Sequence, residues 1–202
     1  MLTKCRALLL ADTPAGTHAL DRFARHVGFS HSGPPGHSLA DVAREIPIFF
    51  FMQQGMPDAL MMATIRWVRG HHQPVVQYAP IIVIANDGPA EETLKYVHMG
   101  CDDVIVMPEE HDVLVSRLKV YVTDEQLYFE TPTYLGPDRR RMEAPDGTRD
   151  ERLSGSSAHR RLTIRRVPGH GVFVLHSERF GDDGQPVAYD PEAASAKMET
   201  VS

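Results

Sequence analysis

One apolar stretch constrains the fold of this chain more than any other: Ile46-Pro47-Ile48-Phe49-Phe50-Phe51-Met52. An apolar run of this length that is closed by Gly55 and Pro57 is typical of a strand buried on both faces. Gln53-Gln54 follow at its carboxyl end, which is the edge where open α/β sheets usually bind ligands. This edge therefore presents amides where a carboxylate could have stood.

Further apolar segments alternate with helical patterns along the first part of the chain. Strands are expected at residues 6–11, 29–30, 46–52, 80–85 and 103–107. Helices are expected at residues 15–26, 38–44, 58–69, 89–99 and 109–121, with a loop over 70–78. Five strands that alternate with five helices predict a doubly wound, five-stranded parallel sheet in α/β order over residues 1–125.

The alternation ends near Asp124, and the composition changes. Residues 131–166 hold nine arginines against five acidic residues, and no lysine occurs between Lys119 and Lys197. Residues 126–202 are therefore expected to form an Arg-rich and mostly disordered tail. The apolar segments around 162–176 predict a hairpin, which is marginal alone and is either disordered or docked on another surface.

Composition excludes several classes of protein. The net charge of -6 argues against a general nucleic-acid binder, although the Arg-rich segment is locally basic. No apolar run approaches the length of a membrane span, and the amino-terminus lacks a small-residue cleavage site. Cys5 and Cys101 are expected to be buried, reduced thiols. We therefore expect a cytoplasmic protein without a membrane partner.

The order of these elements resembles the receiver domain of two-component response regulators, over roughly residues 4–122. The local marks of the resemblance occur in order and at fitting separations. They are Leu8-Leu9-Leu10-Ala11-Asp12, Met56-Pro57, Pro80-Ile81-Ile82-Val83-Ile84, Gly100-Cys101-Asp102-Asp103 and Met107-Pro108. The resemblance implies a (βα)5 signalling domain.

The resemblance also implies a phosphorylation pocket, in which Mg²⁺ and a lysine neutralise charge during phosphoryl transfer to an aspartate. At the two metal-binding positions this chain has Ala11 and Asp12. The phosphoacceptor position is Gln53, the hydroxyl position Ala85 and the lysine position Met107. An amide cannot form an acyl phosphate, and one carboxylate is a poor Mg²⁺ site. The pocket is therefore expected to be degenerate and not phosphorylated.

Several polar residues have two interpretations each. Asp12 is a helix cap or a relic metal ligand, and we favour the cap. Gln53 and Gln54 are satisfied amides or ligands for a small polar molecule, and we favour the former. Asp102-Asp103 are most simply a solvated turn. His71-His72 are expected in an exposed loop, and no cofactor or metal site is expected.

The resemblance implies a partner-binding face that is formed by the fourth helix, the fifth strand and the fifth helix. Lys95, Tyr96 and His98 lie on the fourth helix, and Val104 stands where the family often has an aromatic residue that reports activation. An ordinary amphipathic helix surface is an equally good interpretation of these residues.

The arginines of the tail are candidates for anion binding, because their planar fork suits phosphates and carboxylates. They are Arg139, Arg140, Arg141, Arg160, Arg161, Arg165 and Arg166. The tail is similar in composition to the arginine-rich tails with which some receiver-like regulators bind cyclic di-GMP. A solvated tail without a ligand is an equally good interpretation.

Together these observations predict a non-enzymatic, response-regulator-like signalling adaptor that acts through protein–protein interaction without aspartyl phosphorylation. The alternative is a protein that binds cyclic di-GMP or a nucleic acid through its Arg-rich tail, with nucleic acid the less favoured ligand.

Overall fold

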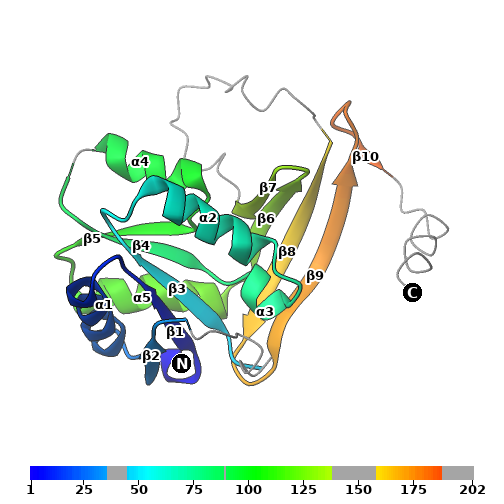
Figure 1. Cartoon of the computed structure of the whole chain (residues 1–202). Coiled ribbons are helices and arrows are strands. Elements are labelled where there is room, and N and C mark those ends of the chain that lie inside the picture. Colours follow the sequence, from blue (N-terminus) through cyan, green and yellow to red (C-terminus); the bar gives the residue numbers. More distant parts are fainter. Residues whose placement is uncertain (36–44, 89, 138–157, 188–202) are drawn as a thin grey trace.

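Two five-stranded sheets make up the structure, a computed structural model that describes residues 1–35, 45–88, 90–137 and 158–187 (Figure 1). The first sheet is parallel and has the order β2-β1-β3-β4-β5. Its strands are β1 (Arg6–Leu10), β2 (His31–Gly33), β3 (Ile48–Gln53), β4 (Ile81–Asn86) and β5 (Asp103–Met107). This is a doubly wound order with a switch point between β1 and β3. The predicted fold class is therefore confirmed.

Helices cover both faces of the parallel sheet (Figure 1). After a short 3-10 turn, η1 (Leu2–Lys4), α1 (Pro14–His26) and α5 (His111–Thr123) lie on one face. The other face carries α2 (Asp58–Arg69), α3 (Pro74–Gln77) and α4 (Ala90–Met99). The helix expected at 38–44 lies outside the described residues. None of the helices within the described ranges is long and apolar enough to cross a membrane.

The short helix α3 occupies part of the segment that we expected to be a loop. Pro74 begins it, in the first turn where a missing N–H costs nothing. Val75 and Val76 are buried in the core, which explains why this single turn is held against the sheet.

The apolar stretch at β3 forms the centre of the core. Phe49, Phe50 and Phe51 are each 0% exposed, and successive side chains point to opposite faces of the strand. Phe50 packs among the residues under α2 and α4, whereas Phe49 and Phe51 pack under α1 and α5. The ring of Phe51 meets that of Phe23 edge-on, with centroids 5.3 Å apart. Burial of each such side chain contributes about 1.5–3 kcal/mol.

The second sheet is antiparallel and has the order β10-β9-β8-β6-β7. Its strands are β6 (Gln126–Thr131), β7 (Tyr134–Pro137), β8 (His159–Val167), β9 (Gly171–Phe180) and β10 (Pro186–Val187). The expectation of a mostly disordered tail is therefore wrong for residues 126–137 and 158–187. The hairpin expected over 162–176 is present and longer, because β8 and β9 pair from His159 to Phe180.

Burial explains why this second sheet is ordered. Leu162 and Ile164 on β8 are 0% exposed and form a small core with Tyr128 on β6 and Tyr78 of the first domain. The hairpin is thus docked on the parallel domain, beside α5 and α3 (Figure 1). The division of the chain at residue 125 into independent units stays a prediction.

A buried carboxylate joins the two sheets. Asp102, which we expected in a solvated turn, is only 3% exposed. Its Oδ2 accepts hydrogen bonds from the backbone N–H of Ile81 (2.7 Å) and from the guanidinium of Arg69, and its Oδ1 accepts one from the Tyr128 hydroxyl. Burial, followed by the charge of Asp102, raises the pKa of Tyr128 well above its usual range. The expectation for Asp102 was wrong because its partners are distant in sequence.

Arg166 extends this network from β8. It is 1% exposed, and its Nη2 donates to the Tyr128 hydroxyl at 2.8 Å. Its other donors reach the backbone carbonyls of Tyr78 (2.8 Å) and Tyr121 (3.3 Å), both in the parallel domain. The guanidinium therefore fastens β8 to the parallel domain at two points of its backbone.

Replacement of Asp102 tests this network. We expect Asp102→Ala to lower the free energy of unfolding by about 3–5 kcal/mol, because it leaves a buried guanidinium without its carboxylate. Urea unfolding followed by circular dichroism measures the change.

Asp58→Ala provides the matched control. Asp58 pairs with Lys95 at 2.6 Å, but the two side chains are 54% and 41% exposed. An exposed pair of this kind contributes little to stability, because water screens the two charges. Equal losses in the two variants would contradict a structural role for Asp102.

Candidate functional site

The residues of the expected degenerate pocket lie at the carboxyl edge of the parallel sheet. Ala11 follows β1, and Gln53 and Met107 are the last residues of β3 and β5. Ala85 lies one residue before the end of β4, and Asn86 at that end pairs with Met107. The structure therefore brings these positions to one edge, as the strand order requires.

The side-chain amide of Gln53 packs against the start of α1. A Cβ atom placed on Gly16 would lie 1.7 Å from Oε1 of Gln53 and 3.0 Å from the Cβ of Ala11. The Gln53 amide thus lies directly over the backbone of α1, beside Ala11. Its Oε1 is buried and accepts no hydrogen bond from the described residues. The expectation of a satisfied amide is therefore wrong for this oxygen.

Asp12 does not cap α1. The N-cap is Thr13, whose Oγ1 accepts a hydrogen bond from the backbone N–H of Gly16 at 3.1 Å, and Asp12 is exposed. Thr13 is the residue placed directly before Pro14, which begins the helix. Within residues 1–35, 45–88, 90–137 and 158–187, no three His, Cys, Asp or Glu side chains gather as a metal site.

Gln54 connects three elements through its side chain. Its Oε1 accepts a hydrogen bond from the backbone N–H of Asn86 (2.7 Å), and its Nε2 donates to Oε2 of Glu92 (2.8 Å). The backbone N–H of Gln54 donates a hydrogen bond to the backbone carbonyl of Ile84 at 3.0 Å. The Gln54 amide is satisfied, as expected, and it ties the end of β3 to the end of β4 and to α4.

Two of the four residues expected on the partner-binding face are buried. Tyr96 and Val104 are 2% and 5% exposed and belong to the core beneath α4, so they cannot contact a partner directly. That expectation was wrong because Tyr96 points from α4 into the core and Val104 points from β5 into the same core. His98 is exposed, and Lys95 is partly exposed and paired with Asp58, whose hydrogen bond raises the pKa of the Lys95 ammonium.

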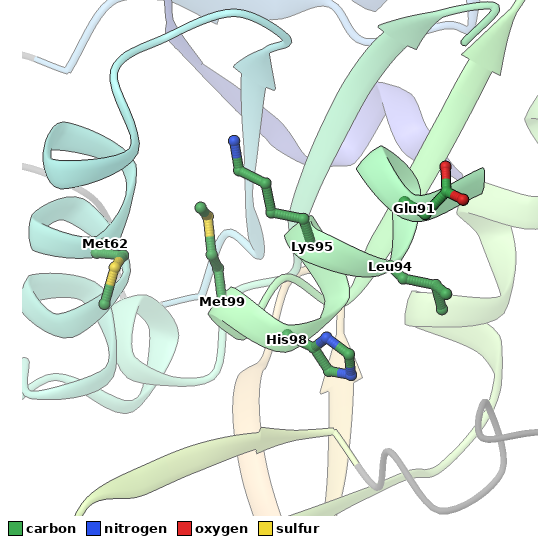
Figure 2. Close-up of a pocket in the computed structure, with 6 residues that line it drawn as sticks. All are labelled: Met62, Glu91, Leu94, Lys95, His98 and Met99. Carbon is green, nitrogen blue, oxygen red and sulfur yellow. The ribbon is translucent and has the colours of Figure 1, made fainter. Parts of the chain in front are cut away.

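A hollow of about 570 Å³ lies between α2 and α4 (Figure 2). The residues that line it are Met62 from α2 and Glu91, Leu94, Lys95, His98 and Met99 from α4. Met62 and Leu94 are large apolar side chains with 37% and 46% exposure. Met62, His98 and Met99 also line a second hollow of about 490 Å³, which extends to the turn between β6 and β7. The two hollows therefore form one groove.

Two of the tail arginines in the described ranges, Arg165 and Arg179, are exposed and have no ion pair there. Arg139, Arg140 and Arg141 lie outside the described residues. Arg160 pairs with Glu130 at 3.1 Å and Arg161 approaches Glu178 at 3.9 Å, whereas Arg165 is exposed and makes no such contact. Arg166 is buried, so its expected role as a surface anion ligand is wrong.

The histidines expected in an exposed loop stack on each other. His71 and His72 have ring centroids 4.5 Å apart, and His71 is partly buried. Burial and the neighbouring His72 lower the pKa of His71.

No protein-family model matches this chain, and no curated protein matches it. Two solved structures are similar to it: the signal receiver domain of a signal transduction histidine kinase from Syntrophus aciditrophicus, and a candidate response regulator from Chloroflexus aurantiacus J-10-fl. Each is 20% identical, covers 57% of this chain and has a TM-score of 0.39. The matches cover 87% and 95% of those chains, respectively. The fold assignment depends on the strand order of this chain itself.

No sequence pattern indicated the roles of two residues that shape the site, Gly16 and Glu92. Gly16 matters because it leaves room for Gln53. It is the third residue of α1 and belongs to no recognisable motif. Glu92 matters as the partner of Gln54, 38 residues away in sequence. Both roles depend on contacts across elements, which local patterns do not encode.

The contact between Gly16 and Gln53 yields a prediction for stability. We expect Gly16→Ala to lower the free energy of unfolding by about 1–3 kcal/mol, because the new methyl group overlaps Oε1 of Gln53. Denaturant unfolding measures the loss.

The same substitution in a Gln53→Ala background is the control. There the overlap with Oε1 of Gln53 is gone and the Cβ of Ala11, at 3.0 Å, is the remaining close neighbour, while alanine favours a helix over glycine by about 1 kcal/mol. The substitution is therefore expected to cost much less in that background than in the wild type. A loss of equal size in both backgrounds would contradict the contact.

Proposed function

We propose that this protein is a signalling adaptor of receiver-like fold that acts through protein–protein contacts without aspartyl phosphorylation. The observation that carries the proposal is the Gln53 amide, which stands where the phosphoacceptor is expected and lies against Gly16. Ala11, Ala85 and Met107 offer only methyl and thioether groups at the surrounding positions. None of these groups can bind Mg²⁺, donate to a phosphoryl oxygen or neutralise its charge.

Contacts that require no ligand connect α4 to the sheet. Gln54 at the end of β3 accepts from Asn86 at the end of β4 and donates to Glu92 on α4. The exposed pair of Lys95 with Asp58 adds little to this connection. The groove between α2 and α4 is therefore presented to a partner at all times, and control of signalling falls to the supply of that partner.

The chemistry of the groove suits a protein partner. Its centre is apolar through Met62, Leu94 and Met99, and Glu91 and Lys95 stand at its rim (Figure 2). Methionine side chains are flexible and adapt to varied apolar surfaces. An apolar centre within a polar rim is the usual anatomy of a protein-binding surface.

Cyclic di-GMP is the alternative ligand, and the described arginines support it less well. Arg161 and Arg165 lie four residues apart on β8, but Arg161 already stacks on Phe180 and approaches Glu178. Arg160 is paired and Arg166 is buried. Arg165 and Arg179 remain available in the described part of the tail, on the two different strands β8 and β9, so we place protein contact first.

Chemical phosphorylation tests the proposed loss of acceptor function. The full chain, incubated with acetyl phosphate and Mg²⁺, is expected to keep the mass of the unmodified protein in intact mass spectrometry. Gln53→Asp is also expected to stay unlabelled, because Ala11, Ala85 and Met107 still lack the groups that support transfer. A base-labile phosphoryl adduct on the wild-type chain would overturn the proposal.

Substitution in the groove tests the binding surface. Leu94→Asp is expected to reduce the amount of protein partner recovered with the full chain by roughly tenfold or more, because it places a charge in an apolar contact. Quantitative mass spectrometry of the recovered proteins measures the change.

Val120→Asp on α5 is the matched control for this substitution. Leu94 and Val120 are exposed to a similar degree, 46% and 42%, on different helices. Recovery is expected to be unchanged for Val120→Asp. Equal recovery in both variants would exclude the groove between α2 and α4 as the binding surface.

A further inference from the structure

Two exposed histidines from different helices meet at the surface of the parallel domain. His26 is the last residue of α1, and His111 is the first residue of α5. Nε2 of His26 lies 3.4 Å from Nδ1 of His111, and the rings are inclined at 72°. The two residues are 85 positions apart in sequence, so the fold alone brings them together.

The distance between these nitrogens matches two corners of a tetrahedral metal site. Two Zn–N bonds of about 2.05 Å that meet at about 110° hold their nitrogens about 3.4 Å apart. We propose that His26 and His111 form a surface site for a divalent cation that prefers imidazole, of which Zn²⁺ is the representative. This inference is independent of the proposed signalling function.

The site is held in shape by the helices that carry it. Phe23 on α1 and Leu114 on α5, each three residues from one of the histidines, are buried in the same core. The two backbones therefore cannot separate without disruption of that core. The imidazoles themselves are exposed, so small side-chain rotations can direct both lone pairs at one ion.

Charged residues of both signs lie next to the pair in sequence. Glu109, Glu110 and Asp112 flank His111, whereas Arg22 and Arg25 precede His26, and all five are exposed. Arg25 is paired with Asp21 at 2.9 Å. With only two protein ligands, the remaining coordination positions belong to water or to a ligand from a bound partner. Imidazole favours Zn²⁺, Cu²⁺ or Ni²⁺ over Mg²⁺ or Ca²⁺.

The pair His71 and His72 is a poorer candidate. Their rings stack almost face to face, with an interplanar angle of 23°. Nδ1 of His71 already accepts a hydrogen bond from the backbone N–H of Gln73 at 3.1 Å. This pair therefore serves as an internal control for metal binding by histidine in general.

Zinc titration of the full chain tests the proposal. Isothermal titration calorimetry is expected to show one Zn²⁺ bound per chain, and His26→Gln or His111→Gln is expected to weaken binding by roughly tenfold or more through loss of the chelate. The double variant His71→Gln/His72→Gln is expected to bind as the wild type does.

Thermal melting provides a second readout. Without metal, the His26 and His111 variants are expected to melt as the wild type does, because these side chains lie at the surface. The His71/His72 variant is compared with its own melt without metal, because His71 is partly buried. With Zn²⁺, the melting temperature of the wild type and of the His71/His72 variant is expected to rise, since a ligand that binds only the folded state stabilises it. No rise is expected for the His26 or His111 variants.

Three results would overturn the proposal: no zinc binding by the wild type, unchanged binding after loss of His26 or His111, or loss of binding in the His71/His72 control.

Discussion

The structure depends on one buried carboxylate, that of Asp102 at the start of β5. It receives the backbone N–H of Ile81, the guanidinium of Arg69 and the hydroxyl of Tyr128, so a single side chain ties β4, α2 and β6 together. Removal of a charge from water costs several kcal/mol unless the partners replace its hydration. Here they do, and Arg166 adds a second guanidinium on the other side of Tyr128. The antiparallel sheet is therefore fixed to the parallel domain by charge as well as by apolar contact.

The second sheet docks at one end of the parallel strands, and the positions of the expected pocket lie at the other end. Asp102 and Ile81 lie at the amino ends of β5 and β4, where the second sheet docks. Gln53 and Met107 lie at the carboxyl ends, where α/β sheets usually bind ligands. Docking of the second sheet therefore leaves the carboxyl edge unobstructed. It reaches only the far end of the groove between α2 and α4, through the turn between β6 and β7.

The sequence predicted the parallel sheet because its strands are continuous apolar runs, as in β3, and its helices have regular apolar spacing, as in α2. It did not predict the second sheet, because Arg166 occupies an inward position of β8 where an apolar residue would have completed the alternation. For Asp102 the local pattern was typical of a turn, while the residues that bury it lie 33 and 26 positions away. The predicted strand ends located the residues of the expected pocket. They did not predict the contact of Gln53 with Gly16. Such contacts between distant segments depend on the packing of the whole domain.

The two glutamines at the end of β3 differ in what holds their amides. Burial of Gln53 Oε1 without a hydrogen bond from the described residues costs on the order of 1–3 kcal/mol, so this amide is not explained by stability alone. Gln54, by contrast, uses both ends of its amide to join the end of β3 to the end of β4 and to α4. An amide with a partner at each end orients the segments that it joins, and here it needs no ligand to do so. The carboxyl edge of the sheet therefore combines one amide with a structural role and one whose buried oxygen has no partner among the described residues.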